Sequence, residues 1–101
     1  MYVHLSIHNL TMQFEWDDNK NIANIRKHGI NFADVVDMFN HPMLNLVDNS
    51  QYYEEERWIA IGLIKRLIGV VVYTERRGDT IRIISARKAT KHEVKRYEQH
   101  T

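Results

Sequence analysis

LIGVVVYTERRGDTIRIISAR, residues 67–87, is the stretch of the sequence that decides the fold. Residues 69–74 and 80–85 are two runs rich in β-branched side chains, which favour extended strands. The segment between them contains Gly78, whose lack of a Cβ permits the positive φ of a tight reversal. The pattern predicts a β-hairpin, around which the rest of the chain is organised.

The second predicted strand carries arginines among isoleucines. Side chains alternate between the two faces of a strand, so Ile81 and Ile83 point to one face and Arg82 to the other. Arg87 has the opposite parity to Arg82, so the two arginines share a surface only if the strand bends or ends near residue 85. A guanidinium on a half-apolar strand needs a carboxylate or phosphate partner, so this face is predicted to bind an anion.

Length and composition indicate one compact domain. The chain has 101 residues, of which 44% are hydrophobic and 10% aromatic, which suits a modest core. It has no cysteine, which excludes disulfides and thiolate metal sites and favours a reducing, cytoplasmic location. No apolar run reaches the ~18 residues of a membrane-spanning helix, so no membrane association is expected.

Charge is distributed unevenly along the chain. Residues 1–56 contain three basic and nine acidic side chains, a net charge of −6. Residues 57–101 contain eleven basic and four acidic side chains, a net charge of +7. This asymmetry favours a polyanionic partner for the second half of the chain, with ordinary scattered surface charge as the alternative.

Residues 2–10 alternate between apolar and polar types, which leaves two interpretations open. They form either an added edge strand or a leader ahead of the better-patterned sequence that starts at Met12. We expect the leader, with residues 1–11 disordered and a single domain over residues 12–101.

The next elements follow from caps and periodicity. Residues 13–16 are predicted to form a short strand, and Asp17 or Asp18 to cap a helix that Gly29 ends. Asn31 is expected to cap a second helix. The apolar stripe of that helix consists of Phe32, Val35, Val36 and Phe39.

Two further strands and a last helix complete the predicted fold. Residues 43–47 and 53–62 are predicted strands, and Thr90 and Glu93 form a capping box that opens the last helix. Because short turns join the strands, the sheet is expected to be mostly antiparallel. The predicted fold class is α+β, a small, mostly antiparallel sheet with helices packed on one face.

The candidate functional residues are a constellation of charges rather than a known catalytic motif. The six histidines show no metal-ligand spacing within one predicted element outside the leader, so we expect neither a metal nor a cofactor. Cleavage of RNA without metal requires a base for the 2′-hydroxyl, cations for the phosphate and an acid for the 5′-oxygen. The catalytic candidates are Arg82, Arg87, Glu75 and His28, and the further RNA-binding candidates are Lys27, Arg76, Lys88 and Lys91.

Each catalytic candidate also has a purely structural interpretation. His28 suits a helix end, where a cation complements the dipole. Glu75 suits an ion pair with an arginine such as Arg82. Arg82 and Arg87 suit a bridge to the acidic run at residues 54–56. Residue chemistry alone therefore predicts a small cytoplasmic α+β domain with a basic sheet face, and stops short of an enzyme.

Two motifs stand in order along the chain, KHG at residues 27–29 and RIISAR at residues 82–87. The residues that accompany them are Phe14-Glu15-Trp16-Asp17, Lys20, Asn24, Phe32, Glu56-Arg57, Ile61-Gly62, Thr74-Glu75-Arg76, Ala89, Glu93 and Tyr97. Together they resemble the BrnT family of toxins from bacterial type II toxin–antitoxin pairs. The resemblance covers residues 13–98, and the leader and the basic pair in the hairpin turn lie outside the family pattern.

The resemblance implies a RelE-like fold, with helices on one side of the sheet and an RNA-facing surface on the other. It implies a ribonuclease that cuts RNA and arrests growth, which the lack of a metal-ligand pattern makes metal-independent. It also implies a BrnA-like antitoxin that neutralises the toxin and alone contacts DNA when the pair represses its promoter. It favours Arg82, Arg87, Glu75 and the Lys27-His28 pair as functional residues without assigning base and acid.

Two other functions stay open at this point. The same basic face suits a non-catalytic RNA- or ribosome-binding module. A degenerate toxin that acts only in a repressor complex with its antitoxin is the second alternative. Cleavage of RNA separates the first alternative from an enzyme, and growth arrest separates the second.

Overall fold

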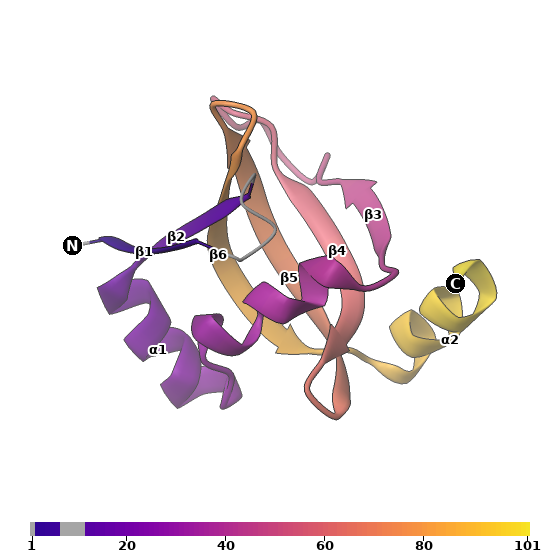
Figure 1. The fold of residues 1–101 in the computed structure, drawn as a ribbon. Helices are drawn as coiled ribbons and strands as arrows, with labels where there is room; N and C mark the ends of the chain where they lie inside the picture. The colour runs from indigo at the N-terminus through magenta and orange to yellow at the C-terminus, as the bar shows by residue number, and fades with distance from the viewer. Residues whose placement is uncertain (1, 7–11) are drawn as a thin grey trace.

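The computed structural model describes residues 2–6 and 12–101, and the predicted hairpin lies at its centre (Figure 1). Strand β5 (Leu67–Arg76) pairs antiparallel with β6 (Thr80–Lys88). Three residues, 77–79, connect the paired residues Arg76 and Thr80, and two of them, Arg77 and Gly78, have positive φ, 56° and 74°. The hairpin prediction is confirmed.

Among the described residues, four more strands extend the hairpin into a six-stranded sheet of order β1-β2-β6-β5-β4-β3. Their bounds are β1 Tyr2–Ser6, β2 Gln13–Asp17, β3 Leu44–Val47 and β4 Trp58–Ile64. All neighbouring strands are antiparallel except β2 and β6, which are parallel. The predicted α+β class is confirmed, and the single parallel pair makes the sheet mixed.

Strand β1 lies in the segment that we expected to be a disordered leader. Tyr2–Ser6 pairs along the whole length of β2, so the expectation is wrong for these five residues and the edge-strand alternative holds there. Without β1, one side of β2 would present unpaired backbone N–H and C=O groups, because its other side pairs with β6. Met1 and residues 7–11 lie outside the described residues.

Helix α1 (Asp18–His28) begins and ends where the caps predict. The Asp17 carboxylate accepts a hydrogen bond from the backbone N–H of Lys20 at 3.2 Å. Gly29 ends the helix in the left-handed region, with φ of 72°. Lys20 is thereby fixed in the first turn of α1, close to the end of β2.

A buried asparagine attaches α1 to the sheet. The side-chain oxygen of Asn24 accepts from the N–H of Ala86, and its NH2 group donates to the carbonyl of the same residue at 2.9 Å. Strand β2 pairs with β6 only as far as Arg82, so farther along β6 has no neighbouring strand on that side. Asn24 takes the place of that strand at Ala86.

The segment after α1 forms two 3₁₀ turns instead of the predicted α-helix. Asn31 caps η1 (Phe32–Asp34) as expected, and η2 (Val36–Asn40) follows it. The fully buried side chains of the segment recur every third residue, which is the 3₁₀ period: Phe32, Val35 and Met38. Val36 and Phe39 from the predicted stripe are only partly buried, although the Phe39 ring packs edge-on against two core rings at 5.2 and 5.1 Å.

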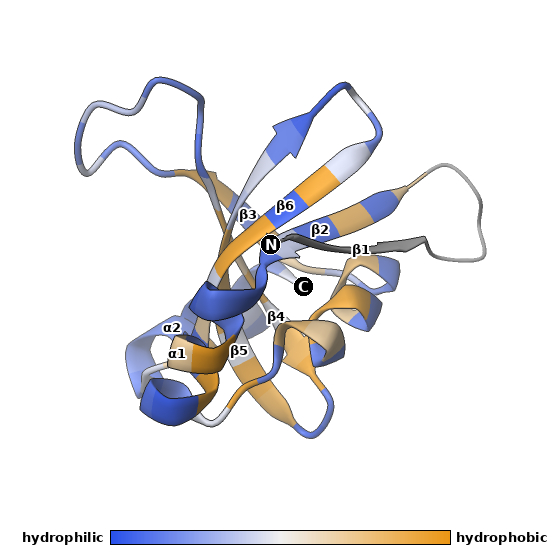
Figure 2. Cartoon of the chain, turned by 90° about the vertical axis from the view of Figure 1, so that its left-hand side faces the viewer, coloured by the Kyte–Doolittle hydropathy of each residue, from blue (hydrophilic) through white to orange (hydrophobic). Residues whose placement is uncertain are grey.

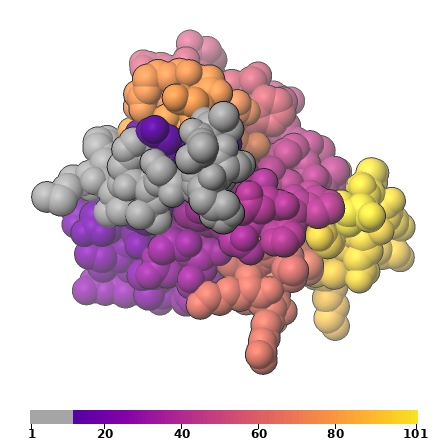
Figure 3. All heavy atoms as spheres, in the orientation of Figure 1, coloured from indigo at the N-terminus to yellow at the C-terminus, as the bar shows by residue number. Residues whose placement is uncertain are grey.

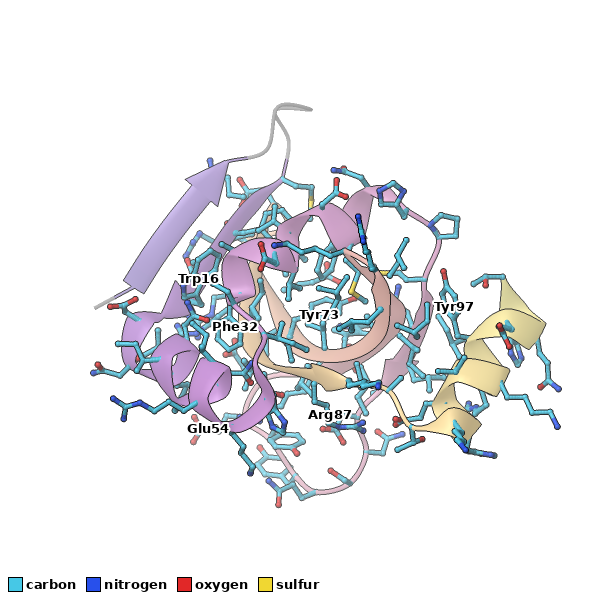
Figure 4. The ribbon with its side chains drawn as sticks, turned by 90° about the horizontal axis from the view of Figure 1, so that it is seen from below. Trp16, Phe32, Glu54, Tyr73, Arg87 and Tyr97 are labelled. Atoms are coloured by element: carbon cyan, nitrogen blue, oxygen red, sulfur yellow. The ribbon has the colours of Figure 1, made fainter. Side chains whose placement is uncertain are left out.

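The larger apolar cluster lies on the concave face of the curved sheet, under η1 and η2. Figure 4 shows three of its members, Trp16, Phe32 and Tyr73, inside the curve of the strands. Polar and apolar residues alternate along β2 and β6, as the colours in Figure 2 show. The alternation lets these strands bury one face while the other carries charge.

A smaller apolar cluster on the convex face holds helix α2 (Lys91–His100), so α2 lies on the face opposite to η1 and η2, whereas the prediction placed the helices on one face. Ile61 and Val70 belong to it, and each adjoins a residue of the larger cluster in its strand, so their side chains point to the opposite face. The predicted capping box starts α2, which contacts the cluster through Val94 and Tyr97. Figure 3 shows α2 at the edge of the molecule, away from α1. No helix among residues 2–6 and 12–101 is long and apolar enough to cross a membrane.

A bulge in β6 places Arg82 and Arg87 on the same face. Two consecutive residues of β5 pair with Ser85 and Ile83, which leaves Ile84 without a partner in the ladder. The extra residue reverses the alternation of side chains, so both arginines point to the convex face. The bulge is therefore the irregularity near residue 85 that Arg82 and Arg87 need in order to share a surface.

Candidate functional site

A cleft of about 600 Å³ opens on the convex face beside Arg82. The first turn of α1, residues 53–57 and the strands β5 and β6 form its walls. Its lining residues are Lys20, Tyr53, Glu54, Glu55, Arg57, Thr74, Arg76, Arg82 and Ile84. These residues, called the basic cleft below, include four cationic side chains and two carboxylates, a composition that attracts anions.

The outer wall of the basic cleft is a loop, residues 48–57. The strand predicted over residues 53–62 begins only at Trp58, so that prediction is wrong for its first half. The backbone N–H of Asp48 donates to the carbonyl of Arg57 at 2.8 Å. This hydrogen bond closes the loop at its base, and the residues before Trp58 are therefore committed to the loop rather than to β4.

Arg82 lies in the cleft beside a carboxylate from β2. The parallel register sets Glu15 directly opposite Arg82, and Arg82 Nη1 is 3.6 Å from Glu15 Oε2. Arg77 reaches the same carboxylate at 3.3 Å. The side chains of Arg82 and Glu15 are 15% and 13% exposed. Two guanidinium groups thus share one largely shielded carboxylate, and the trio keeps a net positive charge.

Two other arginines connect the loop to the sheet and to itself. Arg76 Nη2 on β5 donates to Glu55 Oε1 on the loop at 2.8 Å. The guanidinium of Arg57 stacks over the ring of Tyr53, 4.2 Å from the ring centroid. These contacts hold both guanidinium groups at the rim of the basic cleft.

Two donors in the wall of the cleft have no hydrogen-bond acceptor among the described residues. They are the Thr74 hydroxyl and the Arg76 Nε, and both atoms are buried. Buried polar atoms in native proteins are nearly always satisfied, so an orphaned donor calls for an explanation.

Arg87 shares the convex face with Arg82 but is engaged by α2. Its Nη1 and Nη2 donate to the two carboxylate oxygens of Glu93, both at 2.8 Å. The hydrogen bonds from Arg87 lower the pKa of Glu93 to about 2, and the same pair raises the pKa of Arg87. Figure 4 shows Arg87 and Glu54 outside the curve of the sheet, as labelled side chains. The intramolecular bridge considered for Arg87 exists, but to α2 rather than to residues 54–56.

Glu75 lies on the other side of the sheet from the basic cleft. It pairs with Ile81, a member of the concave cluster, and therefore points away from Arg82. Burial of the Tyr73 side chain, and to a smaller extent the negative charge of the neighbouring Glu75, raises the pKa of Tyr73 to about 12. The structure does not bring Glu75 together with the arginines of the convex face.

The remaining predicted residues lie outside the lining of the cleft. Lys27 and His28 are exposed at the end of α1, and Lys88 and Lys91 are exposed on either side of the α2 cap. Of the eight predicted site residues, only Arg76 and Arg82 line the cleft. In the described part of the chain, no three His, Asp or Glu side chains gather as metal ligands.

Sequence reasoning gave no functional role to seven of the nine residues that line the cleft, among them Lys20, Tyr53 and Arg57. Lys20 and Arg57 were among the residues of the family resemblance but received no role, and Tyr53 was assigned to a strand. A signal was present in the sequence, because Tyr52-Tyr53 and Arg57 flank an acidic run between two strands. Aromatic and basic side chains side by side in a loop are typical of nucleic-acid contacts.

Comparisons with protein families and with solved structures each found a match. Residues 16–93 match the family described as "Ribonuclease toxin, BrnT, of type II toxin-antitoxin system". Among solved structures, the ribonuclease toxin BrnT of Brucella abortus is similar, with 29% sequence identity and a TM-score of 0.58. The alignment covers 75% of this chain and 94% of the Brucella chain. No curated protein matches the sequence. The family match spans well over half of the residues, and the chain therefore belongs to the BrnT family of ribonuclease toxins from type II toxin–antitoxin systems.

Proposed function

We propose that this chain is a metal-independent endoribonuclease that binds a phosphate of single-stranded RNA in the basic cleft. The observation that carries the proposal is the meeting of cationic side chains from four segments around one hollow, namely Lys20, Arg57, Arg76 and Arg82. Guanidinium groups bind phosphate through charge-assisted hydrogen bonds. The orphaned donors of Thr74 and Arg76 add two groups that a phosphate oxygen would satisfy.

The basic cleft has a group for each step of cleavage without metal. A base takes the proton of the 2′-hydroxyl, and the 2′-oxygen attacks the adjacent phosphorus. The 5′-oxygen then leaves with a proton, which gives a 2′,3′-cyclic phosphate and a 5′-hydroxyl. In this proposal Glu54 or Glu55 is the base, Arg57 and Arg82 stabilise the charge that grows on the phosphate oxygens, and Lys20 protonates the leaving oxygen.

In the cell, we expect the chain to act in the cytoplasm, to arrest growth by cutting RNA and to be neutralised by a BrnA-like antitoxin. Residues 57–101 carry a net charge of +7, so an antitoxin that blocks RNA is expected to cover the basic cleft with acidic or apolar groups. DNA contacts in the repressor complex are assigned to the antitoxin. A complex in which the antitoxin leaves the cleft open would replace occlusion by an allosteric mode.

Cleavage of a long RNA in the presence of EDTA tests the enzymatic part of the proposal. The unaltered chain is expected to cut the RNA, and Arg57→Ala and Arg82→Ala to cut it much more slowly. Arg66→Ala is the matched control, because Arg66 is exposed in the turn between β4 and β5 and does not line the cleft. Binding of RNA without cleavage would support a non-catalytic RNA-binding module. Activity only after addition of a divalent cation would refute metal independence.

Expression in a bacterial host tests the toxin part. Growth is expected to stop when the chain is expressed alone and to resume when the antitoxin from the neighbouring gene is expressed with it. A folded chain that leaves growth unchanged would point to a degenerate toxin with a role only in the repressor complex.

A further inference from the structure

We propose that a second hollow, on the far side of the Tyr53–Arg57 stack, binds the nucleobase attached to the phosphate in the basic cleft. The proposal rests on the ribonuclease function proposed above and specifies how the substrate is selected. The base that this hollow favours carries an exocyclic amino group, as guanine, adenine and cytosine do and uracil does not.

The position of the second hollow is the first reason. Its volume is about 240 Å³. Its lining residues are Val47, Asp48, Asn49, Gln51, Tyr52, Tyr53, Glu55, Glu56 and Arg57. Three of them, Tyr53, Glu55 and Arg57, also line the basic cleft, so one wall separates the two hollows. A nucleotide whose phosphate lies in the cleft has its base within reach across that wall.

The loop that forms the second hollow is held by hydrogen bonds between its own residues. The Asp48 carboxylate accepts hydrogen bonds from the backbone N–H and the hydroxyl of Ser50, at 3.0 and 2.6 Å, and from the Tyr53 hydroxyl at 3.1 Å. These hydrogen bonds lower the pKa of Asp48, and the bond from the Ser50 hydroxyl has the largest effect. The Tyr53 side chain is therefore held at its hydroxyl by Asp48 and covered on one ring face by Arg57. A preformed wall of this kind reduces the ordering cost of binding.

The exposed aromatic ring of Tyr52 is the second reason. Tyr52 is 88% exposed, far more than any other large hydrophobic side chain in the described residues, and contributes nothing to either apolar cluster. Unpaired bases of RNA stack on exposed aromatic rings and on arginine guanidinium planes. Tyr52 at the second hollow and Arg57 on the shared wall supply one surface of each kind.

The polar groups of the second hollow decide which base it takes. Three carboxylates, Asp48, Glu55 and Glu56, and only one cation line it, so a second phosphate is repelled. Carboxylate and amide oxygens accept hydrogen bonds from amino groups of bases. Asp48 and Glu55 already have partners, whereas Glu56 forms no ion pair with residues 2–6 or 12–101. Glu56 is therefore the acceptor that we assign to the amino group of the base.

Equilibrium binding of short oligonucleotides with 2′-deoxyribose at the cleavable position tests the subsite without cleavage. Guanine, adenine, cytosine or uracil is placed at one central position of an otherwise uniform uracil strand. The amino-bearing bases are expected to bind about tenfold more tightly than uracil, within the usual range for one base contact. Tyr52→Ala is expected to weaken all four by about tenfold, since stacking on one ring is worth that much, and Tyr52→Phe to restore binding. Glu56→Gln is expected to reduce the preference for the amino-bearing bases over uracil. Glu98→Gln, at an exposed position of α2, is the charge-matched control.

The outcomes separate this inference from the ribonuclease proposal. Equal binding of all four strands, unchanged by Tyr52→Ala, overturns the subsite even if the chain cleaves RNA in the EDTA assay. The expected preference in a chain that cuts no RNA keeps the subsite and overturns the enzyme. No measurable binding of any strand overturns the subsite, and the EDTA assay then decides on the enzyme separately.

Discussion

Arg82 and Arg87 share a face of the sheet but differ in the groups around their guanidinium ions. Arg82 lies 3.6 Å from Glu15, a carboxylate that Arg77 also contacts. Arg87 donates two hydrogen bonds to Glu93, which match its planar fork. A phosphate must break both of these bonds to bind Arg87, whereas Arg82 lines the basic cleft and its 3.6 Å contact to Glu15 is a looser one. We therefore expect Arg82 to serve cleavage and Arg87 to serve the attachment of α2.

Single-turnover cleavage separates these two roles. Arg82→Ala is expected to lower the rate by roughly 10²–10³-fold, as when one preorganised oxyanion donor is removed, and Arg82→Lys to recover little. Arg87→Ala is expected to lower the melting temperature more than the cleavage rate, because it frees α2. An equal loss of rate in Arg87→Ala with an unchanged melting temperature would place Arg87 in the catalytic machinery.

The Arg87–Glu93 pair also predicts a dependence of stability on pH. The pKa of Glu93 lies near 2 in the folded chain, below the ordinary value of 4.5. A depressed carboxyl pKa stabilises the fold fully above about pH 4.5, and the contribution is lost as the pH falls toward 2. Urea unfolding at pH 7 and at pH 3 is expected to show a gap between the unaltered chain and Glu93→Gln that shrinks at the lower pH. A gap that does not change with pH would rule out a charge effect.

At the scale of elements, local sequence was sufficient to predict the helices and strands whose positions depend on residues close together in the chain. The hairpin follows from two β-branched runs around Gly78, and both α-helices begin at caps that the sequence shows, Asp17 and Thr90. The segment after Asn31 was assigned the wrong helical period because Phe32 and Val35 fit periods of 3 and 3.6 equally well. Tertiary packing of the 3₁₀ turns against the sheet decides between them.

The candidate site depends mostly on contacts between distant segments, and these were not predictable. The register of β2 on β6 brings Glu15 to Arg82, and the bulge at Ile84 turns Arg87 to the same face. Neither the register nor the bulge can be predicted from the alternation of side chains along one strand. The Asp48–Arg57 hydrogen bond that makes the outer wall likewise joins residues on either side of a loop. The sequence therefore predicted Arg76 and Arg82 as site residues, but not the other residues that line the cleft beside them.

Asn24 provides a test of how α1 is attached. Its side chain makes two hydrogen bonds to the backbone of Ala86 and one to the carbonyl of Ile30, and all are buried. Asn24→Leu keeps a similar size but leaves these backbone groups unsatisfied, at about 1–3 kcal/mol for each buried group. We expect the free energy of unfolding to fall by at least ~2 kcal/mol, measured in urea. Ala23→Leu, at an exposed position one residue earlier on α1, is the control, and equal stability of both variants would contradict the assigned role.

At the scale of the whole molecule, β1 forms one edge of the sheet and pairs with β2. Deletion of residues 1–11 is expected to leave RNA cleavage intact. It is expected to lower the melting temperature by about 4–8 °C, the shift that ~1 kcal/mol produces in a domain of this size. Loss of the cooperative melting transition would show instead that the edge strand is indispensable to the fold.

The parallel pairing of β2 with β6 has a consequence for when the toxin becomes active. Strand β6 is the last strand in the chain, yet it lies inside the sheet between β2 and β5. During synthesis Glu15 and Lys20 leave the ribosome early, but they have no Arg82 to face until β6 follows them. Such long-range pairing also slows folding once all residues are available. The growing chain therefore carries no assembled cleft for most of its translation, and under the proposed function it cannot cut RNA until the final strand has emerged.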